Sequence, residues 1–89
     1  MTRMQQLEEC FLTAKECGMK YVAIKVEMVG YNKPEIIIND RDNFEKKIEY
    51  YKKAYNDELV LKSFDGIKIV DFCCGNNFES IEGELILYC

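Results

Sequence analysis

The side chains that most often carry acid–base or nucleophilic chemistry are sparse in this chain of 89 residues. It contains no His, the residue that usually acts as a general base near neutral pH. Ser63 and Ser80 have no base at a spacing typical of a catalytic motif, and no glycine-rich phosphate-binding pattern occurs. We therefore predict a protein that is not an enzyme and that binds no cofactor.

Cys73 and Cys74 are adjacent thiols in a segment with the pattern of a strand. Neighbouring residues of a strand point to opposite faces of a sheet, so these two cannot both bind one tetrahedral ion in the usual geometry. We predict no metal site, and we expect one thiol to be buried and the other exposed. A redox role for the exposed thiol is one interpretation, and packing as a small apolar side chain is the other.

Charged residues are distributed unevenly along the chain, whose formal net charge is −4. Residues 57–89 carry seven acidic residues against two lysines. This balance is unfavourable for binding a nucleic-acid duplex, and it suits either solubility or a basic partner. We predict that a protein partner contacts the acidic residues and one loop aromatic, namely Tyr31, Asp57, Glu58, Asp65, Glu79, Glu82 and Glu84.

A second candidate surface lies in residues 46–55, where lysines alternate with tyrosines. On a helix, Lys46, Tyr50 and Lys53 share one face, and proteins that bind single-stranded nucleic acid combine cations with stacking rings in this way. Glu49 interrupts the basic face. An accessory protein that binds nucleic acid through this helix is therefore the alternative prediction.

The spacing of apolar residues predicts two helices, over residues 4–18 and 40–55, because apolar positions recur at steps of three and four. Thr2 is a suitable N-cap for the first helix. Asp42 and Glu45 stand at the spacing of a capping box for the second helix.

Alternating and continuous apolar residues predict strands over residues 20–29, 35–38, 59–62 and 67–72. Asp65-Gly66 predicts a tight hairpin turn between the last two, because glycine adopts positive φ freely. The apolar segment 85–88 is either a short fifth strand or a tail packed against the domain. As an exposed strand it would offer an edge through which two copies could pair.

This order predicts a single α+β domain over residues 1–89, built as a two-layer αββαββ sandwich. Two helices on one face of a mainly antiparallel four-stranded sheet bury every apolar face economically. No apolar segment reaches the roughly 18–20 residues that a membrane span requires. The first residues also lack the pattern of a signal peptide. We therefore expect a soluble cytoplasmic protein, without a membrane partner.

Residues 21–28, 34–39 and 43–56 resemble small uncharacterised proteins encoded in phages and prophages of Gram-positive bacteria. The resemblance covers residues 20–75 and includes no catalytic motif. It implies a protein that binds and blocks a host protein, as anti-CRISPR and other anti-defence inhibitors do. The leading prediction is thus a non-catalytic protein-binding domain, an inhibitor of a host defence or nucleic-acid-processing complex. A self-assembling structural phage protein, such as a homodimer, is a further alternative.

Overall fold

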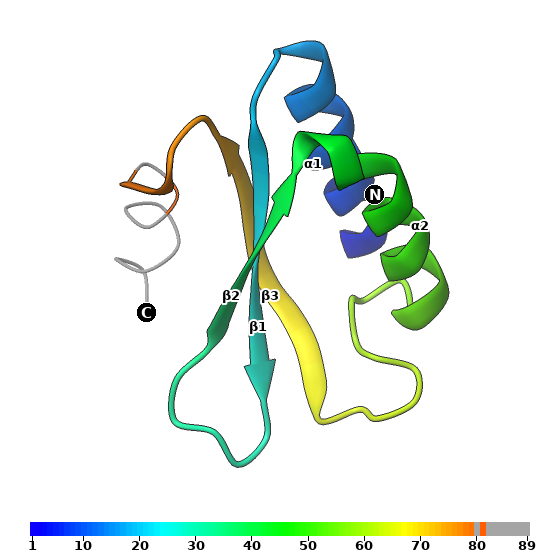
Figure 1. The fold of residues 1–89 in the computed structure, drawn as a ribbon. Coiled ribbons are helices and arrows are strands. Elements are labelled where there is room, and N and C mark those ends of the chain that lie inside the picture. The colour runs from blue at the N-terminus through cyan, green and yellow to red at the C-terminus, as the bar shows by residue number, and fades with distance from the viewer. Residues whose placement is uncertain (80, 82–89) are drawn as a thin grey trace.

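The computed structural model describes residues 1–79 and 81. The chain forms helices α1 (Arg3–Glu16) and α2 (Phe44–Ala54) and strands β1 (Tyr21–Met28), β2 (Glu35–Asp40) and β3 (Ile67–Gly75). The sheet is antiparallel in the order β2-β1-β3, and both helices lie on the same face of it (Figure 1). The predicted α+β class is therefore confirmed.

Helix α1 begins at a complete capping box. Gln5 N–H donates to Thr2 Oγ1 (3.1 Å), and Thr2 N–H donates to Gln5 Oε1 (2.8 Å). These bonds satisfy two amides near the helix N-terminus, where intrahelical acceptors are missing. The predicted N-cap is thus confirmed. The buried side chains of α1, spaced by three or four residues, are Met4, Leu7, Phe11 and Ala14.

Helix α2 begins differently from the prediction. A 3-10 turn, Arg41–Asn43, leads directly from β2 into α2, and Asp42 lies inside this turn. The cap residue Asn43 makes no side-chain hydrogen bond to the first turn of α2. The predicted capping box is therefore wrong, because the chain already winds helically before Asp42 could act as an N-cap.

The main core fills the space between the helices and the facing side of the sheet. The rings of Phe11 and Phe44 meet edge to face there, with centroids 5.5 Å apart. Asn39 is buried beneath them as a polar side chain with two partners: its Nδ2 donates to Val22 O (3.2 Å) and its Oδ1 accepts from the Tyr51 hydroxyl (3.4 Å). A buried amide needs such partners, because an unsatisfied one is costly.

The predicted four-stranded sheet is not confirmed, since the described residues contain three strands. Residues 59–62 contribute only isolated bridges, between Tyr55 and Leu61 and between Val60 and Lys68. Asp65 and Gly66 do form a turn before β3, in which the Ile67 N–H donates to Phe64 O (3.3 Å), but Gly66 does not adopt the predicted positive φ. The predicted strand or tail at residues 85–88 lies outside the described residues.

A side-chain clamp explains why residues 56–60 turn instead of extending. Asn56 Oδ1 accepts from the Glu58 N–H (2.9 Å) and from the Val60 N–H (3.0 Å). Leu59 follows with a φ of 62°, which is uncommon for a residue with a Cβ atom. Its side chain is fully buried in the main core. Burial of this leucine therefore offsets the unfavourable backbone conformation.

The opposite face of the sheet carries a smaller apolar cluster built around Ala23 and Ile81. The Tyr21 and Phe78 rings lie beside it, with centroids 5.0 Å apart. Figure 1 shows the chain leaving β3 on this side of the sheet, away from the helices. The two faces therefore differ, because one is covered by both helices and the other meets the segment that follows β3.

Candidate functional site

The two helices enclose a groove of about 570 Å³ between their outer sides. Phe11 and Phe44 form its floor, and both rings also belong to the main core. Leu12 and Ile48 project from opposite helices above this floor. Leu12 is 55% exposed. The groove is therefore an apolar hollow whose base is part of the folded core.

Two ion pairs join the helices along this groove. Lys15 Nζ lies 2.9 Å from Glu45 Oε1, and Lys52 Nζ lies 3.9 Å from Glu8 Oε1. The hydrogen bond and charge of Lys15 lower the pKa of the Glu45 carboxyl below its usual value. Because a late residue of α1 meets an early residue of α2, and the reverse, the helices run antiparallel. Exposed pairs of this kind add little stability, but they set the register of the two walls.

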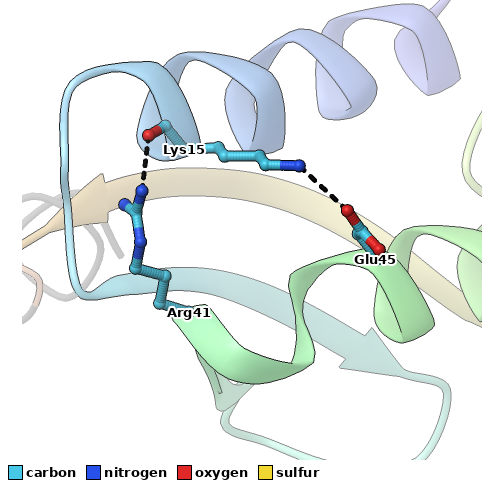
Figure 2. A network of polar contacts seen from close by, with 3 residues as sticks. All are labelled: Lys15, Arg41 and Glu45. Carbon is cyan, nitrogen blue, oxygen red and sulfur yellow. Dashed lines mark hydrogen bonds and ion pairs between the residues drawn. The ribbon is translucent and has the colours of Figure 1, made fainter.

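Arg41 holds the end of α1 against the start of α2. Its guanidinium donates to the backbone oxygens of Ala14 (3.3 Å), Lys15 (2.8 Å) and Met19 (3.2 Å). Carbonyls at a helix C-terminus lack intrahelical donors, and a cation there also suits the helix dipole. Figure 2 shows Lys15 contacted by Arg41 at its backbone and by Glu45 at its side chain. One end of the groove is thus fixed in shape by the fold.

A second hollow, of about 490 Å³, lies between the β1–β2 loop and the turn before β3. It brings together Tyr31 and Asp65, two of the residues predicted to contact a partner. The Val29 N–H donates to Gly66 O (2.8 Å) and so joins the two segments. Tyr31 and Val29 are 69% and 77% exposed. The charged residues that line this loop-end hollow are Glu27, Lys33, Asp65 and Lys68.

The remaining acids predicted as contacts do not gather around that hollow. Asp57 and Glu58 are exposed in the segment after α2, and Asp57 O accepts from the Met4 N–H (3.0 Å). Glu79 is exposed in the segment after β3, on the far side of the sheet from the helices (Figure 1). The described acids of this prediction therefore lie in three separate segments of the chain. Two further predicted contacts, Glu82 and Glu84, lie outside the described residues.

The residues of the nucleic-acid alternative are all exposed on α2, namely Lys46, Tyr50 and Lys53. Tyr50 is 52% exposed, and Lys47 Nζ lies 5.9 Å from the centroid of its ring. The next tyrosines along the helix, Tyr51 and Tyr55, are instead buried in the core. Burial raises the pKa of both hydroxyls above the usual value. One helix therefore presents a basic aromatic surface outward and tyrosines inward.

Cys73 and Cys74 point to opposite faces of the sheet, as their adjacent positions predicted. Cys74 packs against the main core and Cys73 against the smaller cluster. Both are half-buried, so the expectation of one buried and one exposed thiol is wrong. Over residues 1–79 and 81, no group of three or more Cys, Asp or Glu side chains could hold a metal ion. In that same part of the chain, no helix is long and apolar enough to cross a membrane.

The interhelical groove is a feature that sequence reasoning missed. The buried stripe of α1 runs through Phe11, and Leu12 follows it immediately on a different side of the helix. A large apolar residue outside the buried stripe is the signal that could have identified the groove wall. What no pattern could supply is the position of Ile48 opposite Leu12, since that requires the two helices to be placed side by side.

Comparison of the chain with protein-family models, with curated proteins and with solved structures found no match. The interpretation of the site therefore depends on its own residues. They form one groove between helices with an apolar floor, and one hollow between loops with mixed charge.

Proposed function

We propose that this chain is a non-catalytic binding domain for another protein, and that the groove between α1 and α2 receives apolar side chains of that partner. The observation that carries this proposal is the exposure of Leu12 above an apolar floor (55% exposed). Exposed apolar surface that is grouped in a hollow and rimmed by charge is typical of a protein-binding site. A groove whose base is already packed also needs little ordering on binding, which favours affinity.

The residue types around the groove support binding rather than catalysis. The chain has no His. Of the ionisable groups on the groove walls, Lys15 pairs with Glu45 and Lys52 with Glu8. These pairs engage four of the charged side chains on the walls with one another, and the apolar floor lies between the walls.

The identity of the partner is a further part of this proposal. In the phage setting implied by the sequence resemblance, the partner belongs to a host defence complex or to a host complex that processes nucleic acid. Binding of the domain would then block that complex. The resemblance of residues 20–75 supports this part of the proposal, and the groove supports protein binding as such.

Capture of proteins from a Gram-positive lysate tests the proposal when the wild-type chain is compared with two variants. Leu12→Glu places a charge in the groove, and we expect it to reduce capture of the partner at least about tenfold. Val29→Glu is the matched control, because it makes the same change at an exposed apolar residue of the loop-end hollow. We expect it to retain capture.

Three results would contradict the proposal in different ways. Loss of capture with Val29→Glu alone would move the interface to the loop-end hollow. Equal capture by all three proteins would place the partner on neither hollow. The absence of any saturable protein partner at physiological salt would contradict the protein-binding function itself.

A second candidate function is supported by the outer face of α2. Tyr50 is exposed with Lys47 near its ring, and Lys46 and Lys53 flank it on the helix. Titration of labelled single-stranded DNA and RNA tests this candidate by fluorescence anisotropy. Binding should weaken with salt and with the double change Lys46→Gln and Lys53→Gln, because phosphate contacts depend on these cations. No binding at low salt would remove the candidate.

A further inference from the structure

Building on the proposed function, we infer that the α1–α2 groove binds a basic amphipathic helix of the partner protein. The charges along the groove are the first reason, because its lining includes four carboxylates against two lysines and the amino group of Met1. An apolar floor between acidic walls is complementary to an apolar stripe flanked by Lys or Arg. The carboxylates are those of Glu8, Glu9, Glu45 and Glu49.

The ion pairs leave two of these carboxylates available, one on each wall. Lys15 is paired with Glu45 and Lys52 with Glu8, so that within the described residues Glu9 and Glu49 have no cation within 4.0 Å. A partner that places a cation on each side of its apolar stripe would neutralise both.

The positions of these two carboxylates follow from the register of the helices. Moving from Lys15 to Glu8 along α1 corresponds to moving from Glu45 to Lys52 along α2. On this register, Glu9 is level with residue 51, only two positions from Glu49, or about 3 Å along the axis. Glu49 therefore lies near the middle of the groove and Glu9 lies on the opposite wall beside the Glu8–Lys52 pair, so both border the space that a bound segment would occupy.

The shape of the groove favours a helical occupant over an extended one. Both walls are helices, whose backbone amides are already used, so an extended segment would find no strand edge to pair with. A third helix can instead pack its side chains into the groove between two neighbours, with axes about 8–10 Å apart. The distance between the two ion pairs corresponds to about two turns, so a helix of three to four turns covers it.

The test uses a synthetic peptide of about 18 residues, which is enough to span the groove as a helix. One version has leucines on one face and lysines on the other, and its counterpart carries glutamates in place of lysines. Fluorescence anisotropy should show saturable binding of the Lys peptide to the wild-type chain, and binding of the Glu peptide at least about tenfold weaker. Circular dichroism should show that the Lys peptide gains helix on binding.

Variants of the chain locate that binding. The double change Glu9→Lys and Glu49→Lys should weaken binding of the Lys peptide at least about tenfold. Leu12→Glu should weaken it by a similar factor, because it removes the apolar contact. The matched control is Glu16→Lys with Glu35→Lys, which alters net charge equally at exposed residues outside the groove lining. This control should weaken binding at most about twofold, through the overall field. Since the altered side chains at residues 9, 12 and 49 are exposed, circular dichroism should report an unchanged fold.

Several outcomes would overturn the inference while leaving the proposed function intact. One is equal binding of the Lys and Glu peptides, and another is a control double variant that weakens binding of the Lys peptide as much as the changes at Glu9 and Glu49 do. A third is a native partner whose captured segment is extended or acidic. A dimer in light scattering that Leu12→Glu converts to a monomer would also overturn it, because a second copy of the chain would then fill the groove. Failure of the proposed function would appear separately, as unchanged lysate capture by Leu12→Glu.

Discussion

The interhelical groove and the loop-end hollow have similar volumes, about 570 and 490 Å³, but they are supported in different ways. The groove is based on Phe11 and Phe44, both buried in the core, and Arg41 secures one end of it. The loop-end hollow joins two exposed segments through the bond from Val29 to Gly66. Volume alone therefore does not identify a binding site, and the packing beneath a hollow decides whether its shape is present before the partner arrives.

The two hollows also differ in charge. Acidic residues outnumber lysines along the groove, whereas the loop-end hollow has two of each. A net field selects partners by sign and speeds their encounter, but a balanced set of charges does so weakly. We therefore expect the groove to discriminate between partners more strongly than the loop-end hollow.

The largest expected effect tests the support beneath each hollow. Phe11→Ala should lower the free energy of unfolding by about 3–5 kcal/mol, because it leaves a cavity beside Phe44. The corresponding change at the loop end, Tyr31→Ala, should alter it by at most about 0.5 kcal/mol, since that ring is exposed. Urea denaturation measures both values. Equal losses would mean that the two hollows are supported alike.

A smaller effect is expected from the residue that secures the end of the groove. Arg41→Ala should lower the free energy of unfolding by about 1–2 kcal/mol, because it removes charge-assisted hydrogen bonds to the end of α1. Amides in the last turn of α1 should also lose protection from hydrogen exchange. Lys33→Ala, an exposed cation of the loop-end hollow, should change stability by at most about 0.5 kcal/mol. An Arg41→Ala protein as stable as the wild type would show that water replaces the guanidinium at no cost.

The smallest expected effect is a pH dependence of stability that arises from Tyr55, at the end of α2, and not from the loop-end hollow. Burial raises the pKa of the Tyr55 hydroxyl above its ordinary value of about 10, so the folded chain holds this proton more tightly than the unfolded chain. The resulting stability is fully present below about pH 10 and is lost as the pH rises through the folded pKa. Tyr55→Phe should make this loss of stability at alkaline pH smaller. The measurement is the decrease in the unfolding midpoint from neutral pH to pH values above about 10. If Tyr31→Phe at the loop end reduced it as much, the difference between the two regions would not hold.

Part of this fold could be predicted because it depends on neighbouring residues. The Thr2 cap and the helical spacing of α1 are local, and the structure confirms them. The capping box predicted at Asp42 was wrong because a 3-10 turn already precedes α2, and at Asp65-Gly66 the turn is present without the predicted positive φ. At residues 56–60, the Asn56 side chain holds a turn that the apolar pattern alone does not reveal.

The candidate site was predicted less completely than the fold. Tyr31 and Asp65 were expected to act together, and the structure places them in one hollow. The acids predicted as contacts lie in several segments, and Glu82 and Glu84 lie outside the described residues, so the acidic face stays a prediction. Exposure can be predicted for single charged residues, but their grouping depends on which segments become neighbours.

The amino-acid sequence by itself determined which residue types are available and which two segments are helical, because residue types and spacing of three or four act locally. Only the tertiary structure decided that α1 and α2 lie antiparallel with a groove between them. Lys15 and Glu45 are 30 residues apart in the chain, and nothing in either neighbourhood specifies their contact. Such a contact exists because both helices bury their apolar stripes on the same face of one sheet, which brings their remaining sides together.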